Sequence, residues 1–433
     1  MKNARYEAFK ILLKVFKSNA YTNIALDNSL EISELDRRER ALASSIVYGT
    51  VERMMTLDYI ISSFLTQPIE KLKLKVLVIL RMSVYQLYFM DKIPPSAAIN
   101  EAVELTKKCG CSFASSLVNA VLRKCSSDRI DIDSLEESVR FSCPKHLINM
   151  WRKMYGDENV SGLLQTINEK APVTLRVNTL KISQDDLISS FRENGIEAKK
   201  TFLENALTIE NVGSIASLPQ YNDGLFHVQD ISSQLCAKAL DAQPGETVFD
   251  VCSAPGGKTF TVAQYMQNKG VIKSFDIYEH RLKLIDDGSK RLGIDIVETD
   301  VNDASVYNEA LGFADKVLCD VVCSGLGIIR KKPEIRYKDL DSIKQLPETQ
   351  YKILEASSKY VKKGGRIVYS TCALNKKEND KVVDLFLKNH SEFVSVRALP
   401  EVERAVDEND YLTLFPHVNG CDGFFIAVLE RIV

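Results

Sequence analysis

The sequence predicts a multidomain protein: an N-terminal all-α helical bundle, a small α+β module, and a C-terminal α/β doubly wound, Rossmann-like domain ending in an antiparallel hairpin. The 433 residues suffice for two or three domains. Apolar residues recur at helical spacing over residues 4–125. From Gly245 onward, short apolar strands alternate with helical segments. The predicted domains are 1–135, 136–235 and 236–433.

The composition excludes several classes of protein. Hydrophobic residues make up 45% and charged residues 26% of the chain, which excludes disordered, collagen-like and coiled-coil proteins. The formal net charge is −2, so a nucleic-acid contact must come from local basic patches. No apolar run approaches the roughly 18–20 residues of a membrane span. The first seven residues contain no signal-peptide core, so we expect a cytoplasmic protein with no membrane partner.

The cysteines predict neither a disulfide framework nor a metal site. Ten cysteines in so long a chain are typical of reduced, mostly buried thiols. Cys109-Gly110-Cys111 is too tightly spaced for a zinc knuckle, and no second Cys/His pair follows at metal spacing. We therefore expect no bound metal.

The first third is predicted to be a bundle of helices joined by short connections. Asp36 is a predicted N-cap, and Pro94-Pro95 breaks the chain. The apolar stripes and helical segments that support the prediction are Phe9, Leu12, Leu13 and Phe16; Leu42, Ile46, Val47 and Val51; Ile69–Met90; Ala98–Lys108; and Phe113–Lys124.

A polar stretch, Ser126–Glu137, suits a linker and leads to a helix at Lys145–Met154. Between Pro172 and Gly224, a β-like run at Val173–Val177 precedes a helix near Gln184–Asn194, which predicts the α+β module.

The last domain is predicted from repeated strand and helix signals. The predicted strands are Thr247–Val251, Val271–Ile277, Ile294–Val297, Lys316–Asp320 and Arg366–Ser370; the helices include His280–Leu292, Glu348–Val361 and Lys377–Asn389; and the terminal hairpin joins Tyr411–Phe415 to Gly423–Leu429.

A glycine-rich turn follows the first of these strands. It contains Cys252, Ser253, Ala254, Pro255, Gly256, Gly257 and Lys258. In a doubly wound sheet, such a turn places backbone N–H groups and a helix N-terminus at the carboxyl edge, where ligands bind. The spacing is not that of a Walker A loop. Asp276, after the next strand, is placed to accept hydrogen bonds from a ribose, and Asp300, after the third, to hold an adenine amino group. An ordinary βα turn with solvated acids remains the alternative.

Two cysteines follow neighbouring strands of the same sheet. Cys323 lies in Asp320–Gly327 after the fourth strand, and Cys372 ends the run Tyr369–Cys372 after the fifth. Both are expected at the carboxyl edge, beside the glycine-rich turn, where neighbouring strand ends can converge.

These motifs resemble a known family. Val248–Thr259, Asp320–Gly327 and Ser370-Thr371-Cys372 together resemble the RNA (cytosine-5)-methyltransferases that use S-adenosylmethionine, and Val228–Gln234 looks like their lead-in segment. The N-terminal third resembles the RNA-binding domain of the antitermination factor NusB, in Asp36–Arg40, Val47–Thr50 and Leu117–Arg123. The combination is similar to the RsmB (Sun, Fmu) type, which methylates a cytosine of bacterial small-subunit (16S) ribosomal RNA.

The resemblance implies a role for each cysteine. Carbon 5 of cytosine is a poor nucleophile until a thiolate adds to carbon 6, which is covalent catalysis. By resemblance, Cys372 is the nucleophile and Cys323 assists proton removal or product release. Asp320 is assigned to the S-adenosylmethionine site, with contact to the cytosine ring left open. The family's usual proline before the first cysteine is Val322 here, and valine does not fix φ as proline does.

A basic segment, Ile329–Lys338, follows the Cys323 motif. Its cations are Arg330, Lys331, Lys332 and Arg336, which are suited to binding RNA phosphates, and its Tyr337 is suited to stacking on a base. A solvated loop is the alternative. Weaker candidates for RNA contacts are Arg37, Arg38, Arg40, Arg123 and Lys124.

Two alternative functions stay open. One is the same chemistry on transfer RNA or on another ribosomal cytosine. The other is a non-catalytic RNA-binding assembly factor. An amino-group methyltransferase is disfavoured, because Asp320-Val321-Val322-Cys323 lacks the Asn/Asp-Pro-Pro-aromatic tetrapeptide of such enzymes.

Overall fold

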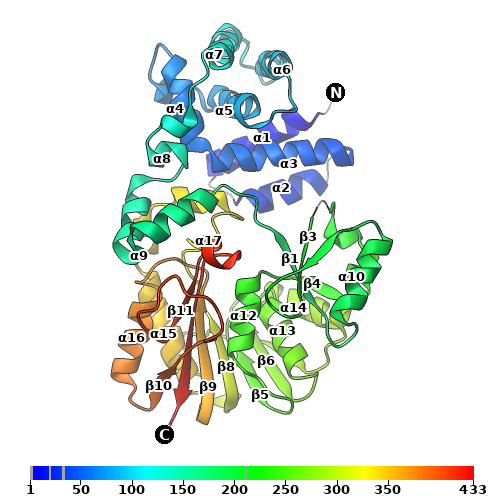
Figure 1. Ribbon diagram of the computed structural model, residues 1–433, viewed down its shortest axis with the longest axis vertical. Helices are drawn as coiled ribbons and strands as arrows, with labels where there is room; N and C mark the ends of the chain where they lie inside the picture. Colours follow the sequence, from blue (N-terminus) through cyan, green and yellow to red (C-terminus); the bar gives the residue numbers. More distant parts are fainter. Residues whose placement is uncertain (1–2, 19–20, 32–34, 211) are drawn as a thin grey trace. The chain divides into compact units, whose positions relative to one another are not determined.

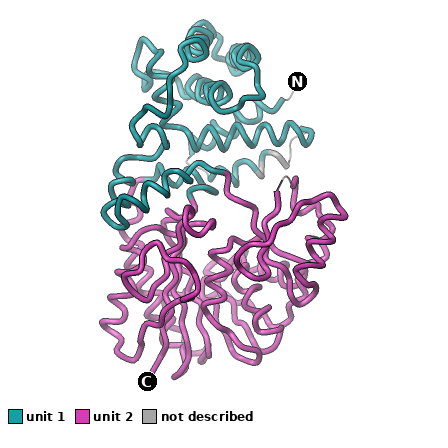
Figure 2. Tube along the Cα trace, viewed as in Figure 1, with its two compact units in different colours: residues 1–169, 329–338 teal, residues 170–328, 339–433 magenta. Residues whose placement is uncertain are grey.

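The structure is a computed structural model that describes residues 3–18, 21–31, 35–210 and 212–433 (Figure 1). Residues 1–2, which belong to the start of the chain used to predict localisation, lie outside that description. By packing, the chain forms two compact units, coloured separately in Figure 2. Unit 1 is Met1–Glu169 with Ile329–Lys338, and unit 2 is Lys170–Ile328 with Asp339–Val433. The three predicted domain boundaries stay a prediction.

Unit 1 is the predicted helical bundle. Its helices are α1 (Ala4–Ser18), α2 (Thr22–Glu31), α3 (Arg37–Glu52), α4 (Met54–Phe64), α5 (Leu74–Phe89), α6 (Pro95–Lys108), α7 (Ser115–Ser127), α8 (Glu137–Arg140) and α9 (Lys145–Thr166), with short 3₁₀ turns η1 (Ile69–Lys71), η2 (Ser112–Ala114), η3 (Ile132–Ser134) and η6 (Pro333–Tyr337). Asp36 caps α3 as predicted, accepting a hydrogen bond from the Glu39 N–H at 2.8 Å. The apolar stripe with Phe9 and Leu12 is buried in the bundle core.

One predicted helix starts too early. Residues 69–71 form the 3₁₀ turn η1, and α5 begins only at Leu74. Lys73 has an extended backbone, with φ −62° and ψ 138°, which interrupts helical hydrogen bonding between the two. The prediction of one continuous helix from Ile69 was therefore wrong at its N-terminal end.

A small antiparallel sheet opens unit 2, as the α+β prediction requires. Its elements are β1 (Val173–Val177), α10 (Gln184–Glu193), β2 (Ala198–Lys200), β3 (Ala206–Ile209), η4 (Ile215–Ser217), α11 (Pro219–Asn222) and β4 (Phe226–Val228). The strand order is β2-β3-β1-β4, with antiparallel neighbours. Leu175 and Val177 of β1 pack against Leu187 and Phe191 of α10, so the helix covers one face of the sheet.

The large sheet of unit 2 is the doubly wound domain. Its elements are α12 (Ile231–Ala239), β5 (Thr247–Asp250), α13 (Gly257–Tyr265), β6 (Val271–Asp276), α14 (Glu279–Leu292), β7 (Val297–Val301), η5 (Glu309–Leu311), β8 (Ala314–Asp320), η7 (Leu340–Ile343), α15 (Leu346–Ser358), β9 (Val361–Thr371), α16 (Asp380–Asn389), β10 (Phe393–Val396), β11 (Leu412–Leu414), α17 (Pro416–Asn419) and β12 (Phe424–Arg431). The order is β10-β12-β9-β8-β5-β6-β7, with β11 paired to β12.

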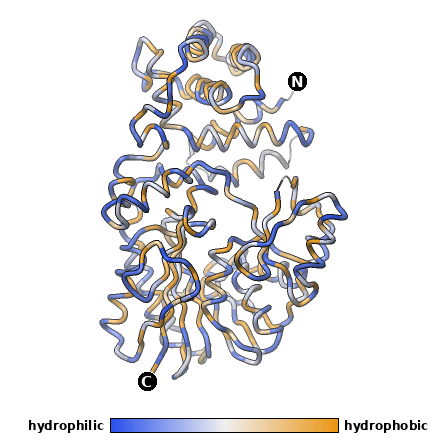
Figure 3. The backbone as a smooth tube through the Cα atoms, in the orientation of Figure 1, coloured by the Kyte–Doolittle hydropathy of each residue, from blue (hydrophilic) through white to orange (hydrophobic). Residues whose placement is uncertain are grey.

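Side chains alternate between the two faces of this sheet. Val248 and Leu318 pack with α12, α13 and α14, whereas their neighbours Phe249 and Val317 pack with α15 and α16. Successive strand residues point to opposite faces, so a strand covered on both sides is apolar throughout. Orange, hydrophobic stretches accordingly run through the region of the large sheet in Figure 3, mixed with hydrophilic residues.

Two details at the edges of the sheet differ from the prediction. The third strand is Val297–Val301 and not Ile294–Val297. Ile294 instead forms part of the C-terminal cap of α14. Gly293 adopts φ 72°, and the Ile294 N–H donates to the Ser289 carbonyl at 2.9 Å. The edge strand β10 was not predicted. The terminal hairpin is confirmed by the antiparallel pairing of β11 with β12.

The strand order reverses next to β5. β6 lies on one side of β5 and β8 on the other, and both pairings are parallel. The loops that follow β5 and β8 therefore separate at the carboxyl edge and leave a crevice, the usual ligand site of such sheets.

Candidate active site

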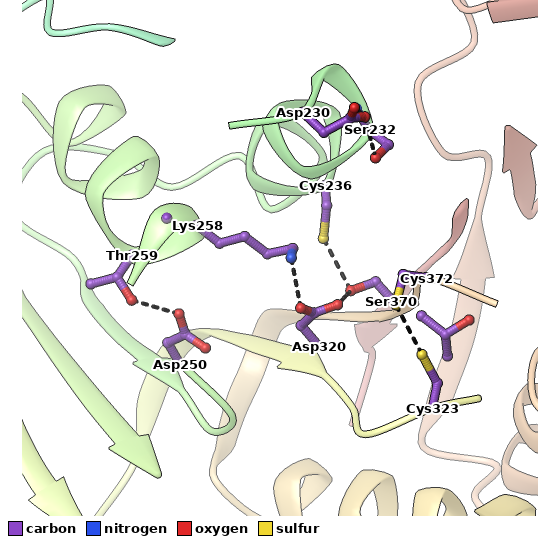
Figure 4. Close-up of polar contacts among 12 residues, drawn as sticks. Asp230, Ser232, Cys236, Asp250, Lys258, Thr259, Asp320, Cys323, Ser370 and Cys372 are labelled. Carbon is purple, nitrogen blue, oxygen red and sulfur yellow. Dashed lines mark hydrogen bonds and ion pairs between the residues drawn. The ribbon is translucent and has the colours of Figure 1, made fainter. Parts of the chain in front are cut away.

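The structure brings Cys323 and Cys372 together. Their Sγ atoms lie 3.2 Å apart at the carboxyl ends of β8 and β9 (Figure 4). The parallel register of these strands, which pairs Asp320 with Ser370, sets the approach. Beyond the strands, the Gly327 N–H donates to the Cys372 carbonyl at 2.9 Å. The two loops are thus joined by backbone hydrogen bonds, although the cysteines are far apart in sequence.

Gly327 is required by this junction. A Cβ atom at that position would lie 1.9 Å from the Gly423 carbonyl oxygen, a backbone atom that cannot rotate away. The Gly423 N–H in turn donates to the Gly327 carbonyl at 2.9 Å. Any side chain at position 327 would force the Cys323 loop away from the Cys372 loop.

The Cys323 thiol is held in its protonated form. Its pKa is raised well above the ordinary value, first by the hydrogen bond to Cys372, then by burial and by the nearby Glu378 carboxylate. A protonated Cys323 beside Cys372 can donate its S–H to a Cys372 thiolate. Burial likewise raises the pKa of Cys252 in the glycine-rich turn, which suits a packing role for that thiol.

Asp320 and Lys258 form an ion pair next to the cysteines. Lys258 Nζ lies 2.6 Å from Asp320 Oδ2, and the Ser370 hydroxyl donates to Asp320 Oδ1 at 2.7 Å (Figure 4). Burial opposes the charge on Lys258, but Asp320 and the other nearby acidic groups outweigh it and raise the pKa of the ammonium. Lys258 therefore remains charged.

A cavity of about 210 Å³ lies beside this ion pair. The predicted residues that line it are Cys252, Ser253, Ala254, Pro255, Gly257, Lys258 and Asp320. Sequence reasoning did not assign the other lining residues, which are Val228, Gln229, Asp230, Ser233 and Asp250. Two signals could have found them: the Val228–Gln234 motif, and the acidic residue that ends β5.

Asp250 gives this cavity its chemical character. The carboxyl is buried, Oδ2 accepts a hydrogen bond from the Thr259 hydroxyl at 2.6 Å, and Oδ1 has no partner among the described residues. Burial raises the pKa of Asp250 to about 7. An unpartnered buried carboxylate oxygen suits a cationic donor, so the residues present fit a ligand with an ammonium or sulfonium group.

The remaining predicted residues lie on the carboxyl edge outside the cavity lining. Asp276 is buried and already accepts from the Tyr278 N–H at 3.0 Å and pairs with Arg281 at 2.8 Å. Asp300 is exposed on β7, next to Phe275 of β6. Gly256 caps α13 with φ 104°, and a Cβ there would lie 2.5 Å from the Phe260 ring.

The basic segment 329–338 packs within unit 1. Arg330, Lys331 and Lys332 are half-buried, and Lys332 Nζ lies 5.3 Å from the centre of the Tyr21 ring. Arg336 is only 1% exposed. Its terminal nitrogens donate to the backbone carbonyls of Glu52, Phe141, Ser142 and Ile167 and to Asn168 Oδ1, at 2.8–3.4 Å. The predicted contact of Arg336 with RNA phosphate is therefore wrong, because its terminal nitrogens already bind protein oxygens.

The part of the chain that the structure describes offers no candidate for metal ligation or for a membrane span. No group of three or more His, Cys, Asp or Glu side chains there could hold a metal ion. None of the described helices is long and apolar enough to cross a bilayer.

Comparisons with known proteins cover all parts of the chain. Residues 237–430 match the family described as 16S rRNA methyltransferase RsmB/F, residues 2–127 match the NusB family, and residues 143–216 match the ferredoxin-like domain of RsmF/B-like methyltransferases. The chain is 37% identical to a probable ribosomal RNA small subunit methyltransferase B of Bacillus subtilis, over 98% of each chain. It is 33% identical to the probable enzyme of the same description from Synechocystis, over 100% of each.

Solved structures share the fold. The crystal structure of PH0851 has a TM-score of 0.83 at 27% identity, covering 98% of this chain and 99% of that one. A methyltransferase homologue from Pyrococcus horikoshii has a TM-score of 0.61 at 31% identity, covering 70% of this chain and 100% of that one. With full-length relatives above 30% identity and paired cysteines at a methyltransferase-type crevice, the chain belongs to the ribosomal RNA small subunit methyltransferase B family.

Proposed function

We propose that the protein transfers a methyl group from S-adenosylmethionine to carbon 5 of a cytosine in small-subunit ribosomal RNA, through a covalent adduct with Cys372. The observation that carries the proposal is the 3.2 Å separation of the Cys323 and Cys372 sulfur atoms beside the crevice. Two thiols in contact suit a reaction that needs one sulfur to add to the base and a second group to help release it.

The cavity is the proposed site of the methyl donor. When bound, S-adenosylmethionine supplies a methyl group on a positively charged sulfur that accepts the electrons of the breaking bond. Asp250 offers an unpartnered carboxylate oxygen to the cationic part of this ligand. The glycine-rich turn offers backbone N–H groups at the start of α13. We keep Asp276 and Asp300 as contacts to the nucleoside, and Asp320 on the donor's side.

Cys372 is the proposed nucleophile. Its thiolate adds to carbon 6 of the cytosine, and the electron pair of the C5=C6 bond makes carbon 5 reactive enough to take the methyl group. Cys323 donates its S–H to the Cys372 thiolate before addition. This contact stabilises the anion without neutralising it.

Cys323 then assists release. Once Cys372 is bonded to carbon 6 it carries no thiolate, so the largest cause of the raised Cys323 pKa is removed. Cys323 can then lose its own proton to solvent water and, as a thiolate, accept the proton of carbon 5. The electrons of the C5–H bond restore the C5=C6 double bond, and the C6–S pair returns to Cys372.

The target base must be unstacked or lie in a loop, because carbons 5 and 6 cannot be reached in this way inside a stacked helix. We keep Arg330, Lys331 and Lys332 as proposed phosphate contacts in unit 1, without Arg336.

Denaturing electrophoresis of single-cysteine variants tests the proposal. Cys323→Ala and Cys372→Ala are each incubated with S-adenosylmethionine and unmodified small-subunit RNA. Cys323→Ala is expected to give a slowly migrating protein–RNA adduct, because addition proceeds and release fails. Cys372→Ala is expected to give no adduct and no methyl transfer.

Other outcomes lead to different conclusions. An adduct only with Cys372→Ala would reverse the two roles. Full methyl transfer by Cys372→Ala would contradict the covalent mechanism. Adduct formation with transfer RNA and not with ribosomal RNA would keep the chemistry and change the substrate. No adduct and no transfer with any RNA would favour the assembly-factor alternative.

A further inference from the structure

Two buried side chains hold the backbone on both sides of Cys323. Gln350 of α15 donates from Nε2 to the Val322 carbonyl at 2.9 Å. Glu378 accepts the Ser324 N–H at Oε2 at 2.8 Å. The two side chains are joined, because Gln350 Nε2 also lies 3.1 Å from Glu378 Oε2. The residues immediately before and after Cys323 are thereby held by one connected pair of side chains.

Glu378 is an unusual group to find at this position. It is 0% exposed, and its second oxygen accepts from Asn375 Nδ2 at 2.8 Å. Burying a carboxyl group is unfavourable unless hydrogen bonds satisfy its oxygens. Here both oxygens have partners, and the group lies close enough to Cys323 to raise the pKa of its thiol. A satisfied buried carboxylate of this kind holds its partners in one arrangement.

The neighbouring residue, Asn379, likewise holds the Cys372 loop by hydrogen bonds. Its Oδ1 accepts from the Thr371 hydroxyl at 2.6 Å, and its Nδ2 donates to the Ala373 carbonyl at 2.7 Å. Asn379 is also 0% exposed. Two adjacent residues just before α16 therefore contact the two cysteine loops: Glu378 binds the residue after Cys323, and Asn379 binds the residues on both sides of Cys372.

Val322 explains why the Cys323 loop needs this support. Its side chain is 55% exposed, so it does not anchor the loop by packing. Valine also leaves φ free, whereas a proline would restrict it to about −65°. The conformation of the loop must then be set by contacts to other parts of the fold.

We propose that Gln350 and Glu378 are positioning residues that orient Cys323, and that they control release of the methylated base and not the addition of Cys372. The inference rests on the proposed function, since it needs Cys323 to act in release. Addition depends mainly on the loop that Asn379 holds. Because Cys323→Ala, which lacks the Cys323 S–H altogether, is still expected to form the adduct, loss of the Gln350–Glu378 contacts should reduce addition only slightly.

The test is Gln350→Met, which keeps the side-chain length and removes both donated hydrogen bonds. Single-turnover methyl transfer is expected to stay within about threefold of the unmodified protein, whereas multiple turnover falls about tenfold, the effect of one net hydrogen bond. The covalent adduct should accumulate on a denaturing gel, as for Cys323→Ala. Lys352→Met is the matched control, because Lys352 lies on the exposed face of the same helix and, among the described residues, forms an ion pair with Glu348 alone.

Two further variants keep the test decisive. Glu378→Gln replaces one accepting oxygen by a donating NH₂ group, so the side chain cannot accept from Ser324, Gln350 and Asn375 together. The Glu378→Gln variant should also accumulate the covalent adduct, and it tests the same proposal if Gln350→Met does not fold. Val322→Pro, added to Gln350→Met, should restore much of the lost turnover by restricting the loop directly.

Opposite results would overturn the inference. Release at the unmodified rate in both variants, with adduct accumulating in Cys323→Ala, would show that Cys323 needs no such support. Equal loss of addition and release, without rescue by Val322→Pro, would indicate a merely structural role. If Cys323→Ala itself gives no adduct, the proposed function fails, and this inference fails with it.

Discussion

Lys258 and Arg336 are two cations that the sequence placed at ligand sites, and the structure gives them different surroundings. Lys258, in unit 2, pairs with the Asp320 carboxylate and lines the cavity beside the cysteines. Arg336, in unit 1, donates to backbone carbonyls and to one amide oxygen, and none of these partners is a carboxylate. The Lys258 side chain is 14% exposed and Arg336 is 1% exposed, so both are largely removed from solvent and the kind of partner is the clearer difference.

The partners make the distinction. A carbonyl oxygen at the end of a helix needs a donor, and a guanidinium can serve several such oxygens at once. Arg336 thus joins the end of α3 to the segments around Phe141 and Ile167. Lys258 has a single strong partner and borders open volume, so a ligand can reach the ion pair.

The largest effect expected from this comparison is that of Arg336→Met on stability. Removing the guanidinium leaves several buried carbonyls without donors, and we expect the loss of about 3–5 kcal/mol. Hydrogen exchange should increase in α3, α8 and α9, while the strands of unit 2 keep their protection. Lys338→Met is the control, since half-buried Lys338 lies on the same segment and contacts the Tyr21 side chain, donating to its hydroxyl at 2.9 Å. Unchanged exchange in the three helices would contradict a structural role for Arg336.

A smaller effect is expected on donor binding around Lys258. Because the pKa of Asp250 is raised to about 7 by burial, the carboxyl takes up a proton as the pH falls below that value. A cationic ligand must displace this proton, so affinity for S-adenosylmethionine should fall by about tenfold per pH unit well below pH 7. Calorimetric titration of the protein with S-adenosylmethionine, from about pH 5.5 to about pH 8.5, measures this affinity.

Two variants sharpen this prediction. Asp250→Asn should bind weakly at every pH, without the dependence. Lys258→Met removes a charge that lowers the Asp250 pKa, so the onset of the loss should move to higher pH. A flat profile for the unmodified protein would show that Asp250 does not face the cationic part of the donor.

The smallest effect is expected for Lys332→Ala. Lys332 lies on the same segment as Arg336 but is half-buried over the Tyr21 ring. Loss of one phosphate contact should reduce the slope of log affinity against log salt by about 1, with methyl transfer at saturating RNA unchanged. Fluorescence anisotropy with labelled RNA over a range of salt concentrations measures the slope. An unchanged slope would remove Lys332 from the proposed RNA interface.

Much of the architecture was predictable because it depends on local pattern. The apolar runs at Thr247–Val251 and Lys316–Asp320 are strands, and the cap at Asp36 begins α3. Errors occurred where one residue serves two elements. Ile294 has strand-like character, yet its N–H completes the end of α14. The periodicity of apolar residues does not reveal that a helix end and a strand compete for the same backbone N–H.

The sequence by itself determined the order of elements, the glycine-rich turn, the two cysteines at neighbouring strand ends and the family resemblance, because strand period and motif spacing are properties of the chain. Only the tertiary structure decided which buried groups face the crevice. Asp250 lines the cavity and has a buried carboxylate oxygen without a partner among the described residues. The Arg336 guanidinium donates to backbone carbonyls, and Gln350 and Glu378 hold the residues on either side of Cys323 from positions distant in sequence. Hydrogen-bond partners across long separations depend on how the strands and helices pack, and no local pattern specifies them.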